Sequence, residues 1–151
     1  MKRILIVFAT LFFLGAVWYG ESRKFYCLDN GECITVWKTY NNVCYIIPGR
    51  YYGILKPSEN FIESTNTNFL TIYFTSEIPN GIVYKSEEPL RITNASKYKM
   101  IFYDYNSSIQ KFDSILYKPH AKRNNDIKDD AWLMDLFIQE NYVLDKTGKH
   151  L

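Results

Sequence analysis

Residues 25–47 read FYCLDNGECITVWKTYNNVCYII, and this stretch alternates short apolar runs with turn residues. Asp29–Gly31 separates the first two runs, and Gly31 can take the positive φ of a bulged hairpin loop. Asn41–Asn42 separates the second run from the third and fits a two-residue turn. The spacing therefore predicts a three-stranded antiparallel meander at the start of the folded part of the chain.

Three cysteines lie within this stretch, at Cys27, Cys33 and Cys44. With Asp29–Gly31 as the loop, Cys27 and Cys33 face each other, at an α-carbon separation of about 4.5 to 5.5 Å that permits a disulfide. The predicted two-residue turn sets Thr39 opposite Cys44, which leaves Cys33 about 20 Å away along the strand. We therefore predict a Cys27–Cys33 disulfide and a free, half-buried Cys44. The alternative is that all three are unpaired small apolar residues.

Strand character returns after a polar segment, Lys56–Asn68, which fits a loop or a short helix beginning at Pro57. Residues Asn68–Thr75 alternate between apolar and polar side chains, which predicts a half-exposed strand. In the middle of Tyr98–Tyr105, apolar residues occupy both odd and even positions, which is typical of a central strand covered on both faces. Shorter strands are expected at Ile82–Lys85, at Ser114–Lys118 and, as an edge strand opened by Pro89, at Leu90–Thr93.

A helix is predicted after Asp129, and Tyr142–Leu144 at its end also fits a terminal strand. The fold class is α+β, with one antiparallel, meander-like sheet of about six or seven strands and the C-terminal helix packed on it. An N-terminal hydrophobic helix precedes the sheet. The alternative is an all-β sandwich. The apolar face of the predicted C-terminal helix consists of Trp132, Leu133, Leu136, Phe137, Val143 and Leu144.

The N-terminus has the order of an export signal. Lys2 and Arg3 precede residues 4–20, a run without any charged side chain. The length of this run favours a cleaved signal peptide. The lack of a small-x-small cleavage motif favours a retained membrane anchor, as do Trp18 and Tyr19, which suit a bilayer interface. Both alternatives place the rest of the chain outside the cytoplasm.

We therefore divide the chain into a signal peptide or membrane anchor, residues 1–20, and a single exported globular domain, residues 21–151. The domain is expected to be secreted, periplasmic, or anchored in the membrane through residues 4–20 with the domain facing outward. Removing residues 1–20 takes away two of the 18 basic side chains and leaves all 16 acidic ones, so the domain is formally neutral. No nucleic-acid surface is expected.

Sequence motifs of catalysis, cofactor binding and metal binding are missing. The chain has no GxGxxG, GxxxxGK[ST], HExxH, CxxC or GxSxG. His120 is a candidate base beside a nucleophilic Cys44, but we expect a solvated loop histidine and a packing cysteine. Asp126, Asp129 and Asp130 lack the glycine turn and distal glutamate of a calcium loop. We predict no catalytic residue, no metal site and no cofactor.

Aromatic residues make up 17% of the chain and include 13 tyrosines. Tyrosine offers contact area with little rotamer entropy and a polar tip, so it is enriched at binding surfaces. We predict Tyr51 and Tyr52 as binding residues, with Tyr73, Tyr103 and Tyr105 as further surface candidates. The predicted function is a non-enzymatic binding module for a protein or another cell-envelope component. The alternatives are an exported hydrolase with a dispersed active site and a structural envelope subunit.

Overall fold

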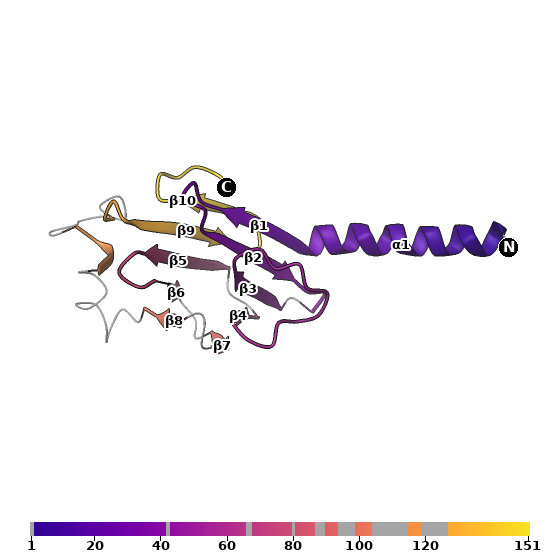
Figure 1. The fold of residues 1–151 in the computed structure, drawn as a ribbon, viewed down its shortest axis with the longest axis horizontal. Helices are drawn as coiled ribbons and strands as arrows, with labels where there is room; N and C mark the ends of the chain where they lie inside the picture. The colour runs from indigo at the N-terminus through magenta and orange to yellow at the C-terminus, as the bar shows by residue number, and fades with distance from the viewer. Residues whose placement is uncertain are drawn as a thin grey trace.

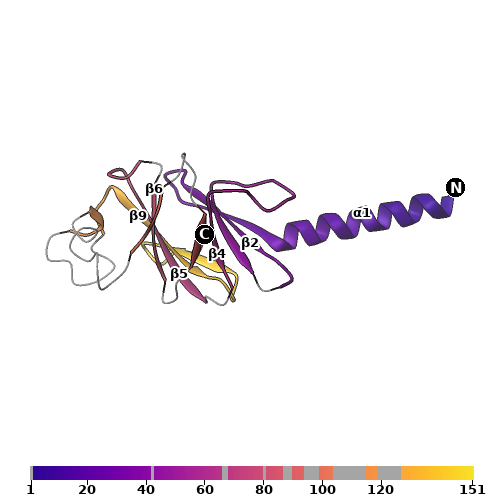
Figure 2. The same cartoon turned by 90° about the horizontal axis from the view of Figure 1, so that it is seen from below.

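One long helix and two β-sheets make up the chain in a computed structural model (Figure 1). The structure describes residues 2–41, 43–65, 68–79, 81–86, 90–93, 99–103, 115–118 and 127–151. Helix α1 (Lys2–Ser22) passes into strand β1 (Arg23–Cys27) without an intervening residue. Figures 1 and 2 show α1 projecting away from both sheets.

The large apolar side chains of α1 are exposed from Ile4 to Trp18. The predicted N-terminal hydrophobic helix is therefore confirmed. In the part of the chain that the structure describes, no helix combines the length and the apolar character needed to span a bilayer. The function of this segment as a signal peptide or membrane anchor stays a prediction.

Sheet A begins with the predicted meander and has the order β1-β2-β3-β4-β7. Cys27 pairs with Cys33 across the first hairpin, as predicted. The predicted register of the second hairpin is wrong by one residue. Lys38, not Thr39, lies opposite Cys44, because the Thr39 N–H bonds to the Val43 carbonyl and lengthens the turn. The other strands of sheet A are β2 (Cys33–Lys38), β3 (Cys44–Pro48), β4 (Phe61–Ser64) and β7 (Arg91–Thr93).

Sheet B has the order β10-β9-β5-β6-β8. All of its neighbouring strands are antiparallel except β6 and β8, which run parallel. The long pairing of β5 with β9 joins segments about sixty residues apart in the sequence. The strands of sheet B are β5 (Phe69–Thr75), β6 (Gly81–Ser86), β8 (Lys99–Phe102), β9 (Ala131–Phe137) and β10 (Tyr142–Asp145).

Sheets A and B face each other and share one hydrophobic core (Figure 2). Val36, Ile46 and Ile62 enter it from sheet A, and Ile72 and Met134 enter it from sheet B. Burying large aliphatic side chains in this way stabilises the fold by about 1.5 to 3 kcal/mol for each side chain. The prediction of a single sheet of six or seven strands is wrong, and the two layers are closer to the sandwich alternative.

The predicted C-terminal helix is also wrong. Residues Ala131–Phe137 form β9, and the alternative of a terminal strand at Tyr142–Leu144 is confirmed by β10. On β9, Met134 and Leu136 face the shared core, whereas Leu133 belongs to a second cluster on the opposite face of sheet B. A strand buried on both faces has apolar residues at nearly every position, and such a run also satisfies the spacing of an amphipathic helix.

Other strand predictions had mixed outcomes. The edge strand at Leu90–Thr93 is confirmed by β7, but β8 lies at an edge of sheet B and not at its centre. β5 is confirmed as a strand, although Thr71 and Tyr73 show that its second face is buried too. The polar segment after Lys56 contains the unpredicted strand β4. Ile115 and Leu116 form a helical turn instead of the predicted strand, and Tyr117 makes only an isolated bridge to Ile127.

Candidate functional site

The outer face of sheet A, which points away from sheet B, is covered by residues 49–60, here called the cover loop. It connects β3 to β4, and these strands pair directly, for example through Ile46 and Ile62. A surface loop of this length with adjacent ends and its own internal packing is an Ω-type loop, a class that is frequently functional. The cover loop carries both predicted binding residues, Tyr51 and Tyr52.

An aromatic cluster lies between the cover loop and the sheet. Trp37, Ile47 and Phe61 are buried there, with Tyr45 and Tyr51 packed against them. The rings of Trp37 and Tyr51 stack with centroids 6.4 Å apart. Aromatic pairs of this kind contribute about 0.5 to 1.5 kcal/mol beyond their burial. The cluster therefore fixes the cover loop to the strands beneath it.

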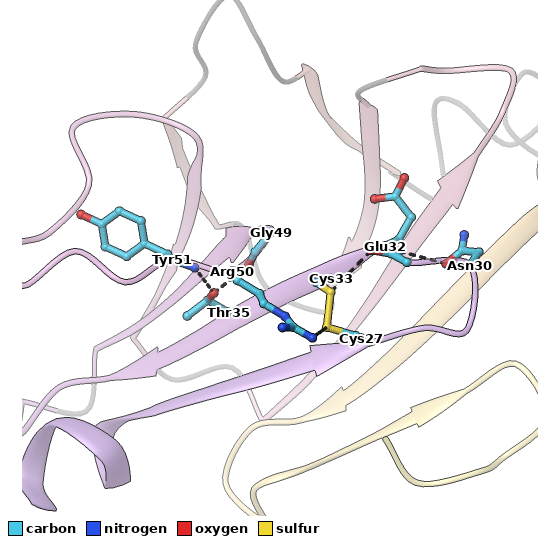
Figure 3. Close-up of a disulfide and its surroundings, with 9 residues drawn as sticks. Cys27, Asn30, Glu32, Cys33, Thr35, Gly49, Arg50 and Tyr51 are labelled. Atoms are coloured by element: carbon cyan, nitrogen blue, oxygen red, sulfur yellow. Dashed lines mark hydrogen bonds between the residues drawn. A yellow bond between two sulfur atoms is a disulfide. The ribbon is translucent and has the colours of Figure 1, made fainter.

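Tyr51 anchors the cover loop and is only partly exposed. Its N–H donates a hydrogen bond to Thr35 Oγ1 at 2.8 Å, and the Thr35 hydroxyl donates to the Gly49 carbonyl at 2.7 Å (Figure 3). Its own hydroxyl donates to the Leu55 carbonyl at 2.7 Å. Tyr51 thus fastens the loop to β2 and also bridges across it. Gly49, at φ 77°, provides the left-handed turn that starts the loop.

Gly53 gives the Tyr51 ring its space. A β-carbon at Gly53 would overlap the phenol of Tyr51. Gly53→Ala is therefore expected to displace Tyr51 and to lower the free energy of unfolding by about 1 to 3 kcal/mol, as overpacked sites do. Urea denaturation measures the loss. Gly15→Ala is the matched control, because the same atom at Gly15 meets nothing within 4 Å; equal effects of both variants would contradict this packing.

Tyr52 points outward and belongs to an exposed apolar patch. Its side chain is 63% exposed, and those of Ile54 and Leu55 are 81% and 79% exposed. The Tyr52 ring also contacts the ring of Phe25 on β1, with centroids 5.0 Å apart. We call Phe25, Tyr52, Ile54 and Leu55 the exposed patch. It places Tyr52 at a surface, as the binding prediction requires.

Arg23 lies where α1, β1 and the cover loop meet. It is only 5% exposed, and its guanidinium lies 4.1 Å from the ring centroid of Tyr19 and 3.8 Å from that of Trp37. Nη2 donates to the Ile54 carbonyl at 3.4 Å, whereas Nε and Nη1 have no partner among the described residues. Cation–π attraction in a desolvated site amounts to about 2 kcal/mol. Arg23 therefore ties the end of α1 to the outer face of sheet A.

Lys56, within the cover loop, is a second cation beside the aromatic cluster. Its ammonium group forms an ion pair with Glu63 at 2.8 Å and lies within 5 Å of the ring centroids of Tyr45 and Phe61. The hydrogen bond to Glu63 raises the pKa of Lys56. Because Lys56 is exposed, this pair orients the side chain more than it stabilises the fold.

The predicted Cys27–Cys33 disulfide is confirmed and lies at the end of sheet A opposite α1 (Figure 3). The α-carbons are 4.1 Å apart. Arg50, at the start of the cover loop, places Nη2 3.5 Å from the Cys27 sulfur. The disulfide therefore closes the β1–β2 hairpin beside the point where the cover loop leaves the sheet.

Cys44 is free, as predicted, but it is fully buried in the shared core and not half-buried. Burial raises the pKa of its thiol to about 12, so the reactive thiolate is scarce at neutral pH. It shares a face with Ile46, whereas Trp37, expected on that face, belongs to the opposite one. His120, the proposed base, lies outside the described residues. Cys44 therefore acts as a packing residue.

The remaining candidates do not join this site. Tyr73 and Tyr103 are buried in the second core cluster, so their prediction as surface residues is wrong. Burial raises the pKa of Tyr73, whose hydroxyl hydrogen-bonds that of Tyr117.

Tyr105 and Asp126 lie outside the described residues. Asp129 pairs with Lys118 and Asp130 accepts from Ser76, and in the described part no group of three or more His, Cys, Asp or Glu side chains is placed to hold a metal.

Comparison with protein-family models, curated proteins and solved structures finds no match to the chain. The site therefore rests on its own geometry. Sequence reasoning missed Arg23, Ile54 and Leu55, and the last two carried a visible signal: an apolar pair inside a loop between Gly53 and Pro57. No local sequence signal pointed to Arg23, because the two aromatic rings that its guanidinium contacts belong to Tyr19 on α1 and Trp37 on β2.

Proposed function

We propose that the chain is an exported, non-enzymatic binding module that contacts a protein or another cell-envelope component through the exposed patch. The observation that carries the proposal is the exposure of Tyr52, Ile54 and Leu55 on a loop whose other side is firmly packed. Contiguous exposed apolar side chains mark interaction sites more often than scattered ones. The disulfide is consistent with an oxidising, exported location.

The anchoring of the cover loop favours binding over a passive surface role. Thr35, Tyr51 and Arg23 hold the loop in place through its backbone. A loop that is already ordered loses little conformational entropy when a partner covers it, and more of the contact energy then appears as affinity. Tyr52, Ile54 and Leu55 are thus presented in advance of binding.

The test is chemical crosslinking of the full chain in cells that express it, followed by mass spectrometry of the adducts. The double variant Ile54→Ser with Leu55→Ser is expected to weaken capture of the crosslinked component by about a hundredfold or more, because each of the two apolar side chains contributes about 1.5 to 3 kcal/mol when fully buried. Tyr40→Ser is the matched control, since Tyr40 is 86% exposed and lies on the β2–β3 turn outside the patch. Undiminished capture by the double variant would refute the proposal.

A further inference from the structure

The exposed patch lies beside the C-terminal end of α1 and is hydrogen-bonded to it. The Tyr19 hydroxyl of α1 donates to the Tyr52 carbonyl at 2.8 Å, and Arg23 donates to the Ile54 carbonyl at 3.4 Å. Phe25, two residues further along β1, contacts the Tyr52 ring. Whatever surrounds the C-terminal end of α1 therefore also meets the exposed patch.

The surface of α1 indicates what surrounds it. Its large side chains are apolar and exposed on every side, from Ile4 at 62% through Phe12 at 81% to Trp18 at 57%. A helix that is apolar all round is covered either by other protein or by lipid. This run ends with Trp18 and Tyr19, and Glu21, Arg23 and Lys24 follow, the order of an apolar phase followed by an aromatic and charged interface.

The cover loop places aromatic, apolar and cationic side chains beside the end of α1. Tyr52, Ile54 and Leu55 are exposed, and the cation Lys56 follows them directly. The acidic side chains on this part of the chain are Glu63, which is bonded to Lys56, and Glu59, which lies beyond Lys56. Cations beside apolar side chains complement the phosphate groups and the acyl boundary of a lipid surface.

We propose that the exposed patch docks on a lipid surface, with Tyr52, Ile54 and Leu55 entering the headgroup region beside the end of α1. This inference rests on the proposed function and names the component that the exposed patch contacts. It concerns the membrane interface, where amphipathic elements bind without crossing the bilayer. The domain then meets the membrane with the end of sheet A that is nearest α1 (Figures 1 and 2).

Site-specific photocrosslinking of the full chain tests the inference. The photoreactive amino acid p-benzoylphenylalanine replaces Tyr52 in one sample and, as the control, Asp129 in another. Asp129 has a side chain that is 95% exposed and lies two positions before β9, whose first residues lie at the end of the sandwich away from α1 (Figure 1). Each protein is reconstituted into vesicles of phosphatidylcholine and phosphatidylglycerol in equal parts, irradiated and analysed for lipid adducts by mass spectrometry.

A lipid adduct at position 52 and none at position 129 is the expected result. Adding Ile54→Ser and Leu55→Ser to the position-52 protein is expected to reduce the adduct to the control level, while protection of the buried Cys44 thiol from iodoacetamide shows that the domain is folded. Equal yields at both positions, or an adduct at position 52 with a second copy of the chain in place of lipid, would overturn the inference. The proposed function would still stand if the crosslinking in cells showed dependence on Ile54 and Leu55.

Discussion

Raising the pH above 9 is expected to destabilise the domain steeply. Burial raises the pKa of the Cys44 thiol from 9.0 to about 12 and that of the Tyr84 phenol from 10.0 to about 12. Between these limits the unfolded chain releases protons that the native state retains, so the free energy of unfolding falls as the pH rises. The slope is about 1.4 kcal/mol per pH unit for each such group. The stabilisation that these two groups provide is fully present at a pH below their unfolded-state pKa values of 9.0 and 10.0.

Urea denaturation at a series of pH values measures this effect. Cys44→Ala separates the thiol from the tyrosines, because it removes the group that titrates first on unfolding. We expect this variant to be less stable at neutral pH, since it leaves a small cavity in the shared core, but to lose stability with a shallower slope just above pH 9. Parallel curves for the variant and the natural chain would show that Cys44 is not protonated and buried in the native state.

Removing the disulfide is expected to lower the free energy of unfolding by about 2 kcal/mol, the loss that loop-closure entropy assigns to a short closed loop. Cys27 and Cys33 are separated by six positions, so the loop is short and the effect lies at the lower end for natural disulfides. The double variant Cys27→Ala with Cys33→Ala tests this by denaturation. A reducing agent should destabilise the natural chain by a similar amount and leave the double variant unchanged.

Thiol counting gives an independent measurement of the same linkage. In denatured but unreduced protein one thiol, Cys44, should react with iodoacetamide, and after reduction all three cysteines should react. Before denaturation Cys44 should be protected by the shared core. Three reactive thiols without reduction would contradict the Cys27–Cys33 disulfide.

Features encoded by neighbouring residues could be predicted from the sequence. The β1–β2 hairpin and its disulfide follow from Asp29–Gly31, a local turn that sets Cys27 opposite Cys33. The apolar character of α1 is equally local. Tyr52 was also predictable as a candidate, because adjacent aromatic residues after Pro48 and Gly49 suggest an exposed turn.

Features that depend on long-range packing could not be predicted in this way. β9 pairs with β5 across more than fifty residues, and this long-range pairing covers the whole run from Ala131 to Phe137 and favours a strand over a helix. Tyr51 was assigned to the surface, but its ring in the cover loop stacks on Trp37, a residue of β2 that is distant in the sequence. The separation of residues into two sheets likewise follows from which faces meet, and the order of strands along the chain does not specify this.

The direct passage from α1 into β1 has a mechanical consequence. With Ser22 and Arg23 adjacent in the chain, there is no flexible tether between the helix and the edge strand of sheet A. A force or torque applied to α1 is delivered to β1 and is opposed by the bonds from Tyr19 and Arg23 to the cover loop. The cover loop thus braces the joint, and the orientation of the domain is set by the direction in which the helix points.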